Sequence, residues 1–221
     1  MQAKDIYAVV SSRLQDMKDP RRWPWESSGD NEVGLERFLN NATLSVVSQR
    51  PDATASIKTI TLSEGSLQTL SVGDFFLLDC LYFLDEGKPV HSLTRINRAD
   101  IDAYSLNWPS KDSAIYHWAY ERAVNPRNYW VVSGAKAGDK IMASVSKKPT
   151  VVTSPTTKLN LTPTYQPALV EAVLYQVFAS DTSDTNYQKA MGCLETFARI
   201  LGVKFETDVN APFITRRSEG N

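Results

Sequence analysis

The strongest constraint on the fold is a change in the spacing of apolar residues along the chain. Near both ends, apolar residues recur every three or four positions, which is the pattern of a helix packed on one face. Between residues 52 and 155, short alternating runs are separated by Gly, Pro, Asn and Asp, which is typical of β-strands joined by turns. These patterns predict an α+β fold in which two helical segments flank an inserted β-rich domain.

Two helices are predicted ahead of the inserted domain. The first covers residues 5–17 and should end before Pro20, because the residue that precedes a proline is displaced from the helical region. Its apolar face carries Ile6, Val10, Leu14 and Met17. The second should begin after a cap at Ser28 or Asp30 and end ahead of Pro51. Its apolar face carries Leu35, Phe38, Leu39, Ala42 and Val46.

Two further helices are predicted behind the inserted domain. The third opens at Pro163 or Thr164, and its apolar side carries Leu169, Ala172, Val173 and Val177. The fourth is capped by Ser183 and is followed by Gly202, a residue suited to the position just after a helix. The apolar residues of this helix are Tyr187, Ala190, Met191, Leu194, Phe197, Ala198 and Leu201.

The four helices are predicted to pack together as one four-helix bundle. Each has a single apolar face that needs a partner, whereas the inserted domain, residues 52–155, is able to bury its own alternating side chains. Residues 1–51 therefore form the first half of the bundle and residues 156–202 the second. Residues 203–221 combine isolated apolar residues with polar ones, which is the pattern of an extended C-terminal tail.

The inserted domain is predicted to be an antiparallel β-sandwich or a small β-barrel. It opens with a hairpin signal, in which residues 57–62 and 67–70 flank a turn at residues 63–66. One short helix is expected at residues 97–104, where the first residue, an asparagine, is its cap. Further strands are predicted at residues 75–84, 89–96, 115–120, 129–132 and 140–145. Residues 147–163, rich in Thr, Ser and Pro, are predicted to cross back as an extended segment and not as a packed element.

The charge balance limits the classes of partner. The chain has 24 Lys and Arg residues against 25 Asp and Glu residues, so its formal net charge of -1 offers no overall attraction to nucleic acid or to an anionic membrane. No stretch approaches 18 apolar residues and the first residues lack a signal-peptide pattern, so we expect neither a membrane span nor a signal peptide. Cys80 and Cys193 lie in apolar surroundings, which predicts reduced, buried thiols and a cytosolic compartment.

Motifs that carry chemistry are not evident, so we predict that the chain is not an enzyme and holds no metal or cofactor. His91 and His117 occur in strand-like contexts without a metal-ligand spacing. There is no Gly-x-Ser-x-Gly nucleophile pattern, and residues 134–138 are typical of a turn and not of a phosphate-binding loop. A hydrolase stays open as an alternative, with its acid residues drawn from Asp79, Asp85, Asp100 and Asp102.

Aromatic residues are concentrated in a few short clusters. Tryptophan and tyrosine, together with arginine, are enriched at protein interfaces and also stack on sugars. The same residues favour β-strands, so packing in the core is an equally good explanation. The tryptophans that we assign to subunit or tail interfaces are Trp23, Trp25, Trp108, Trp118 and Trp130.

Short motifs follow one another along nearly the whole chain in a characteristic order. The N-terminal part carries Asp5-Ile6-Tyr7, Arg22-Trp23-Pro24 and Arg50-Pro51-Asp52. The middle carries Pro89–Ile96, Arg98–Asp102, Trp108, Tyr116–Tyr120 and Asn125-Pro126-Arg127, and the end carries Tyr165–Tyr175, Ala179-Ser180-Asp181 and a closing helix to Lys204. In this order the chain resembles the head-to-tail adaptor, or connector, protein family of podovirus-like tailed bacteriophages. It departs from that family at Trp130–Ser133, where the usual motif is Tyr-Val-Tyr-Pro-Pro.

The resemblance implies a structural virion protein that forms a ring of twelve copies between the portal and the tail tube or nozzle. Such a ring is part of the DNA channel that serves packaging retention and genome ejection. The implied partners are further copies of the chain, the portal protein, the tail tube or nozzle protein, tail fibres, and double-stranded DNA that passes without sequence recognition. The protein is expected in the neck and tail of the virion after assembly in the host cytoplasm, with no membrane partner.

The ring would also explain many aromatic residues without an active site, because a closed ring needs two different complementary faces on each subunit. We expect the C-terminal tail to become ordered against the portal. The residues of the tail that we assign to this contact are Phe205, Val209, Phe213, Ile214, Arg216 and Arg217. The alternative function is a carbohydrate-binding phage tail or fibre module, in which Trp108, Trp118 and Trp130 stack on sugars.

Overall fold

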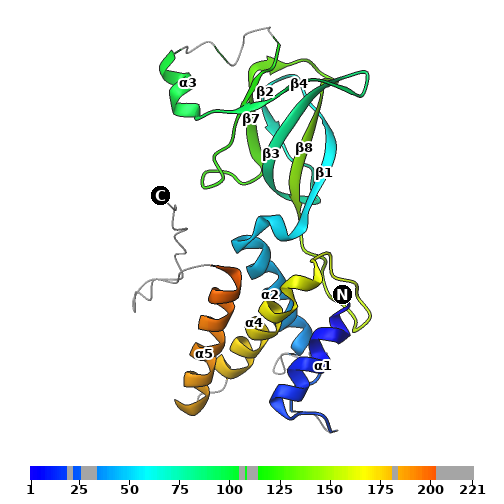
Figure 1. Cartoon of the computed structure of the whole chain (residues 1–221), viewed down its shortest axis with the longest axis vertical. Helices are drawn as coiled ribbons and strands as arrows, with labels where there is room; N and C mark the ends of the chain where they lie inside the picture. Colours follow the sequence, from blue (N-terminus) through cyan, green and yellow to red (C-terminus); the bar gives the residue numbers. More distant parts are fainter. Residues whose placement is uncertain (19–21, 26–33, 105–107, 109–113, 181–183, 203–221) are drawn as a thin grey trace. The chain divides into compact units, whose positions relative to one another are not determined.

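The computed structural model describes residues 1–18, 22–25, 34–104, 108, 114–180 and 184–202 (Figure 1). These residues contain five α-helices and two four-stranded β-sheets, which confirms the predicted α+β class. The chain divides into two compact units. The helical unit consists of the described parts of Met1–Ala53 and Pro149–Asn221, and the β unit consists of those of Thr54–Lys148.

The helical unit is arranged around one central helix. Its described α-helices are α1 (Ala3–Leu14), α2 (Leu35–Gln49), α4 (Gln166–Ala179) and α5 (Asp184–Leu201). Because α1, α2 and α5 all pack against α4, this helix is buried on more than the one side that its sequence predicted. Its buried residues are Ala168, Leu169, Val170, Glu171, Ala172, Val173, Leu174 and Val177. A regular four-helix bundle stays a prediction.

Local backbone geometry decides where the helices end. The first helix stops at Leu14 and not at Met17, because Gln15 adopts a left-handed conformation with φ of 56° and its N–H bonds back to Ser11 and Ser12. Met17 is consequently 60% exposed. At the other end of the chain, Gly202 has φ of +67° and ends α5, which confirms its predicted position. The predicted caps Ser28, Asp30 and Ser183 lie outside the described residues.

The segment that returns from the β unit is packed, contrary to the prediction for residues 147–163. Val152, Leu159 and Leu161 are buried. Its backbone is also bonded, since Ala3 donates an N–H bond to the carbonyl of Thr157 and the side chain of Asn40 bonds to Val152. The buried residues are too widely spaced among Thr, Ser and Pro to give a periodic signal, which is why the sequence pattern missed them.

The β unit consists of two sheets that enclose an apolar core. One sheet has the order β1 (Ala55–Thr61), β8 (Lys140–Lys147), β3 (Asp74–Asp85), β4 (Lys88–Ser92). The other has the order β2 (Gly65–Thr69), β7 (Asn128–Ala135), β6 (His117–Ala119), β5 (Thr94–Arg95). In the first sheet, β1 and β8 pair in register from Ala55 opposite Ser146 to Thr61 opposite Lys140. The core between the sheets includes Leu77, Cys80, Trp118, Tyr129, Val131 and Ile141.

The predicted hairpin over residues 57–70 is wrong. Both strands exist as β1 and β2, but β1 pairs with β8 and β2 pairs with β7, so the turn between them leads from one sheet to the other. The buried side chain of Gln68 holds this corner. Its Oε1 accepts the N–H of Ser63, and its Nε2 donates to the carbonyl oxygens of Ser63 and Gly65. These bonds satisfy turn groups that a hairpin partner would otherwise have bonded.

One strand pair departs from the predicted antiparallel arrangement. Thr94 and Arg95 of β5 pair in parallel with His117 and Trp118 of β6. A parallel pair requires a long crossover instead of a tight turn, and here more than 20 residues separate the two strands. This connection contains α3 (Arg98–Tyr104), which confirms the short helix predicted at residues 97–104. Asn97 caps it, since its Oδ1 accepts the N–H of Ala99 at 3.2 Å.

The two ends of the β unit lie within hydrogen-bonding distance of each other. The hydroxyl of Thr54, the first residue of the unit, donates to the carbonyl oxygen of Lys147 at 2.8 Å. It also lies 3.0 Å from the hydroxyl of Ser146. The chain therefore enters and leaves this unit at one place.

Candidate functional site

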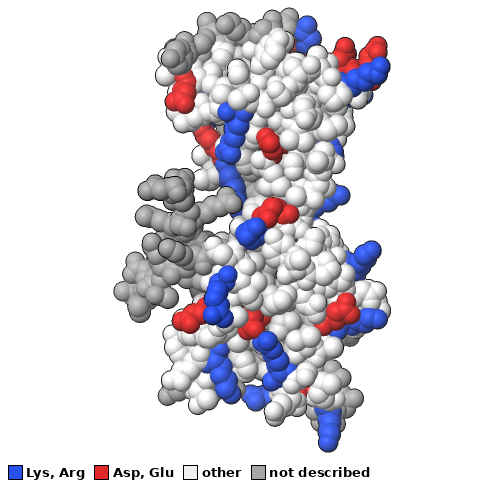
Figure 2. Space-filling view, viewed as in Figure 1, with Lys and Arg blue, Asp and Glu red and all other residues white. Residues whose placement is uncertain are grey.

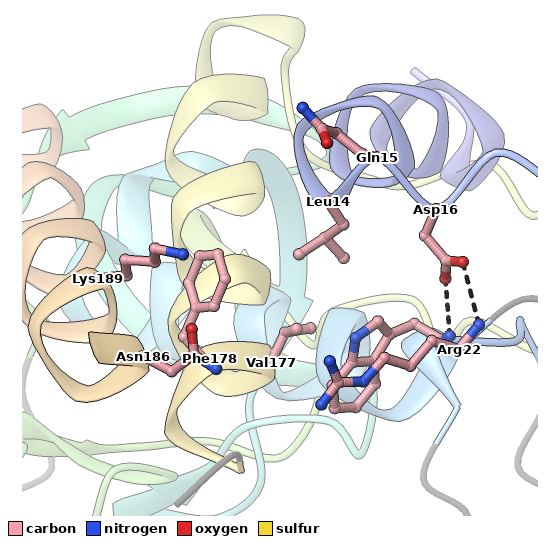
Figure 3. Close-up of a pocket in the computed structure, with 9 residues that line it drawn as sticks. Leu14, Gln15, Asp16, Arg22, Val177, Phe178, Asn186 and Lys189 are labelled. Atoms are coloured by element: carbon pink, nitrogen blue, oxygen red, sulfur yellow. Dashed lines mark hydrogen bonds between the residues drawn. The ribbon is translucent and has the colours of Figure 1, made fainter. Parts of the chain in front are cut away.

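The helical unit has hollows on both sides of α4, and we name two grooves after the helices that flank them. The α1–α5 groove consists of two pockets, of about 380 and 400 Å³, that share Phe178 and Lys189. The first pocket is lined by Leu14, Gln15, Asp16, Arg22, Trp23, Val177, Phe178, Asn186 and Lys189 (Figure 3). The second is lined by Arg13, Glu171, Leu174, Phe178, Lys189, Gly192, Cys193 and Thr196. The α2–α5 groove, of about 370 Å³, is lined by Asn41, Ser45, Gln49, Ala172, Tyr175, Gln176, Leu194 and Phe197.

Asp16 shapes one end of the α1–α5 groove. Its Oδ1 accepts the backbone N–H of Arg22 at 3.0 Å, and its Oδ2 accepts that of Trp23 at 2.8 Å (Figure 3). One carboxylate thereby fixes the start of the Arg22-Trp23-Pro24 step beside the end of α1. The ring of Trp23 then lies 6.1 Å from that of Phe38 on α2, so the loop is tied to two helices.

Glu171 joins three helices from within the central one. It lies on α4 and is only 8% exposed. Its Oε1 accepts a 2.5 Å hydrogen bond from the guanidinium of Arg13 on α1, and its carboxylate also bonds the thiol of Cys193 on α5. A buried carboxylate without partners is strongly destabilising, so these two neighbours account for a charge inside an apolar helix.

The thiol of Cys193 is held in its protonated form. Burial raises its pKa to about 11, and the neighbouring Glu171 carboxylate adds to this shift. Burial likewise raises the pKa of Cys80 in the β unit. Both cysteines are free, but only Cys80 is fully buried, so the prediction of buried thiols is wrong for Cys193. Because a thiol reacts as its thiolate, neither residue is an activated nucleophile at neutral pH.

The two grooves differ in charge. In the α1–α5 groove, the Nζ of Lys189 lies 5.6 Å from the ring centroid of Phe178, opposite Leu14 of α1 (Figure 3). The side chain of Arg13 is 52% exposed at its rim, although it is paired with Glu171. The α2–α5 groove is lined by neutral residues alone. Elsewhere on the face seen in Figure 2, Lys and Arg lie among Asp and Glu, and wide areas carry neither.

The polar wall of the α2–α5 groove is a closed network around Gln176. The Nε2 of Gln176 donates to the carbonyl oxygens of Phe38 and Ala172, both at 3.0 Å. Its Oε1 accepts from the side chain of Asn41 at 3.1 Å. These bonds tie α2 to α4 along the groove, so its wall is rigid and neutral.

A smaller pocket of about 140 Å³ lies beside Tyr7 and Trp25. Their rings meet edge to face with centroids 3.6 Å apart. The Oη of Tyr7 and the Nε1 of Trp25 are buried, and the described residues offer neither of them a hydrogen-bond partner. Burial, assisted by Glu36, raises the pKa of the Tyr7 hydroxyl. This hydroxyl is therefore neutral at any physiological pH.

The tryptophans singled out by the sequence fall into two groups. Trp108 and Trp118 are 5% and 1% exposed, and Trp108 donates from Nε1 to Asp102 at 2.8 Å. These two are packed inside the β unit. Trp23, Trp25 and Trp130 are half-buried, and the guanidinium of Arg98 lies 4.5 Å above the ring of Trp130. The tail residues Phe205, Val209, Phe213, Ile214, Arg216 and Arg217 lie outside the described residues.

These positions bear on the two alternative functions. A sugar-stacking face needs exposed rings, and the burial of Trp108 and Trp118 leaves only Trp130 partly accessible among the three proposed for it. Of the acid residues considered for a hydrolase, Asp102 is engaged by Trp108 and lies 3.5 Å from the guanidinium of Arg98. Within the described ranges, no three His, Cys, Asp or Glu side chains gather as a metal site would require. None of the helices in the same ranges is both long and apolar enough to cross a membrane.

Sequence reasoning missed the polar residues that tie separate segments of the chain together. Glu171 had a visible signal, since it is the one charged residue in the run from Ala168 to Leu174. Asn40 and Gln68 had none, because a lone amide side chain in a helix or strand is usually exposed. Only the structure shows that each bonds to backbone groups of another segment or turn.

Comparison with known proteins gives one result that covers both units. A family model described as SU10 adaptor protein matches residues 1–216 of the chain. No curated protein matches it. The matched range contains every element named above, including both grooves and both β-sheets.

Proposed function

The chain belongs to the SU10 adaptor protein family, and on this premise we propose that it forms a ring between the portal and the tail tube or nozzle of a tailed bacteriophage. Membership confirms the resemblance drawn from the order of motifs. It makes the chain a structural adaptor protein of a phage virion. We also propose that the ring lies between the portal and the tail, that it contains twelve copies and that it forms part of the DNA channel.

The observation that carries the proposal is the extent of the family match. It runs over residues 1–216 of 221, so it includes the helical unit, the β unit and most of the C-terminal tail. A match of that extent applies to the whole arrangement and not to one shared module. An adaptor must hold two different partners, and a chain with two separate compact units offers a distinct surface for each.

A closed ring requires two different, complementary faces on each subunit. We assign the half-buried Trp23, Trp25 and Trp130 to such faces, because aromatic rings that are partly exposed in one subunit gain burial when a neighbour covers them. Trp108 and Trp118 support the β unit from within. The predicted four-helix bundle, with halves at residues 1–51 and 156–202, would be the rigid part of the ring.

The tail is the proposed portal contact. Phe205, Val209, Phe213 and Ile214 supply apolar side chains, and Arg216 and Arg217 supply positive charge near the end of the chain. An extended segment that becomes ordered on binding is able to wrap a large surface of its partner. Tail fibres are a further proposed partner.

The charge of the chain is compatible with a channel through which DNA moves. At a net charge of -1 per copy, twelve copies would carry about -12, so the ring as a whole would not attract DNA phosphates. Strong attraction through many Lys and Arg contacts would retain the genome instead of releasing it. Double-stranded DNA is therefore proposed to pass through without sequence recognition.

The decisive experiment mixes the purified chain with the portal protein of the same phage. Native mass spectrometry should show a defined complex with twelve copies of the chain per portal, and electron microscopy should show a closed ring at one end of the portal. Failure to associate, with the portal shown competent by another partner, would overturn the proposal. A ring of another copy number would overturn the stoichiometry alone.

A further inference from the structure

The α1–α5 groove runs beside the helix from which the tail departs. Its lining includes Asn186, Lys189, Gly192, Cys193 and Thr196, which follow one side of α5 for most of its length. α5 ends at Leu201, and Gly202, with φ of +67°, turns the chain out of the helix. The tail therefore begins at one end of the groove.

The lining of the groove defines the chemistry of its occupant. Leu14, Leu174 and Phe178 offer apolar surface, while Arg13 and Lys189 place positive charge at the rim. Of the two carboxylates that line the groove, Glu171 is paired with Arg13 and Asp16 accepts the backbone N–H groups of Arg22 and Trp23. The described contact of Lys189 is with the ring of Phe178. An extended segment in which carboxylates alternate with apolar side chains matches this surface.

The first half of the tail has this composition. Phe205-Glu206-Thr207-Asp208-Val209 carries two acidic residues between two apolar ones, and Phe213-Ile214 follow. We propose that residues 205–214 of the same chain occupy the α1–α5 groove, with Glu206 and Asp208 facing Lys189 and Arg13 and with the apolar side chains in the two pockets. The inference concerns the unassembled chain, in which no portal competes for the same tail residues.

The lengths agree with this arrangement. The 18 residues of α5 rise about 27 Å at roughly 1.5 Å per residue. Residues 203–214 reach about 40 Å when extended at roughly 3.3 Å per residue. After a turn at Gly202, the tail is therefore long enough to run back along the whole groove.

The tether favours occupancy by the chain's own tail. A short linker between a segment and its site gives an effective concentration in the millimolar range, so even a weak contact is mostly formed. A second copy would have to compete with this concentration. The α2–α5 groove starts beside the same helix end, but its neutral lining offers nothing to Glu206 and Asp208.

Gly192 gives a direct test in the full-length chain, because it lines the α1–α5 groove, is exposed and leaves open space for an added Cβ. In a Cys193→Ser background, Gly192→Cys is combined with a single cysteine at Phe205, Val209 or Phe213, and disulfide formation under a mild oxidant is mapped by mass spectrometry. The matched control replaces Gly192→Cys with Leu194→Cys, which places the thiol in the α2–α5 groove. At least one tail position should form an intramolecular disulfide with the thiol at position 192 ten times faster than with the thiol of the control. Equal rates for the two thiols, a preference for the control, no disulfide at position 192, or mainly disulfide-linked dimers would overturn the proposal.

A charge exchange tests the recognition itself in the same full-length chain. Lys189→Glu should raise the rate of chymotrypsin cleavage after Phe205 and Phe213 at least fivefold, and so should Glu206→Lys combined with Asp208→Lys. A variant that combines Lys189→Glu with both tail substitutions should again be protected from cleavage. Lys158→Glu, an exposed lysine of the same unit outside the groove, is the control. If Lys189→Glu behaves like this control, or if the joined changes do not restore protection, the assignment of the groove is wrong. Circular dichroism checks that each variant keeps its fold.

Discussion

Asn40 and Val152 hold each other through two hydrogen bonds that run in opposite directions. The Nδ2 of Asn40 donates to the carbonyl oxygen of Val152 at 3.0 Å, and its Oδ1 accepts the N–H of Val152 at 2.7 Å. The amide side chain thus replaces a β-strand partner for one residue of the returning segment and fixes that segment to α2. Val152 is fully buried, so water is not available to take over either bond.

Asn40→Asp should therefore destabilise the protein by about 1–3 kcal/mol, because a carboxylate cannot donate and would face the carbonyl oxygen of Val152. Urea unfolding followed by circular dichroism measures the change. The adjacent Asn41→Asp is a matched control, since Asn41 is exposed and its side chain bonds to that of Gln176. If the two variants lose the same free energy of unfolding, the two hydrogen bonds between Asn40 and Val152 do not stabilise the protein as predicted.

The contact between Arg13 and Glu171 leads to a second prediction. Arg13→Met leaves a buried carboxylate without its partner, and we expect a loss of about 2 kcal/mol, below the range for fully buried pairs because Arg13 is half exposed. Adding Glu171→Leu should recover most of this loss, since two apolar side chains have no desolvation cost. Thermal and urea unfolding of both variants test this. Arg37→Met, at an exposed position of α2, should change stability by less than about 0.5 kcal/mol.

The pKa of Cys193 predicts slow thiol chemistry. With a pKa of about 11 in place of the usual value, only a small fraction is thiolate at pH 8. Its reaction with a disulfide reagent should be roughly 100-fold slower than that of an unhindered thiol. Glu171→Gln removes the negative charge beside the thiol and should accelerate the reaction. Stopped-flow absorbance measures both rates. A wild-type rate equal to that of glutathione would contradict the assigned environment.

Tyr7 predicts how stability depends on alkaline pH. Burial raises its pKa in the folded protein, so the unfolded chain releases the phenolic proton first and stability falls as pH rises through about 10. Tyr7→Phe removes this contribution and breaks no hydrogen bond to a described residue. The free energy of unfolding of Tyr7→Phe, relative to that of the wild type, should therefore be about 1 kcal/mol higher near pH 11 than at pH 7. Tyr187→Phe, at an exposed position, should keep the alkaline loss of the wild type.

Helix positions were predictable because one apolar face repeats within a single stretch of sequence. Leu35, Phe38, Leu39, Ala42 and Val46 were assigned to one face of the second helix, and all five are buried there. The end of the first helix was not predictable from Met17, because a left-handed Gln15 leaves no mark in an apolar pattern. The aromatic clusters likewise carried no sign of which rings would be buried.

Strand partners depend on contacts that sequence spacing does not contain. The signal for β1, a turn and β2 is the same whether the two strands pair with each other or lie in different sheets. The outcome is decided by β7 and β8, which begin 59 and 79 residues after the ends of β2 and β1 and take these strands as their neighbours. The grooves were unpredictable for the same reason, since the entire β unit separates α1 and α2 from α4 and α5 in the sequence.

The hydrogen bond from Thr54 to Lys147 has a consequence for how such a chain can evolve. Because the two ends of the β unit lie next to each other, its insertion does not separate the two points of the helical unit to which it is joined. Recombination at these two points is thus able to exchange the β unit for another, or to shorten it to a loop, without separating α2 from the segment that follows Pro149. The helical frame and the inserted module are accordingly free to diverge at different rates, each under selection from its own partners.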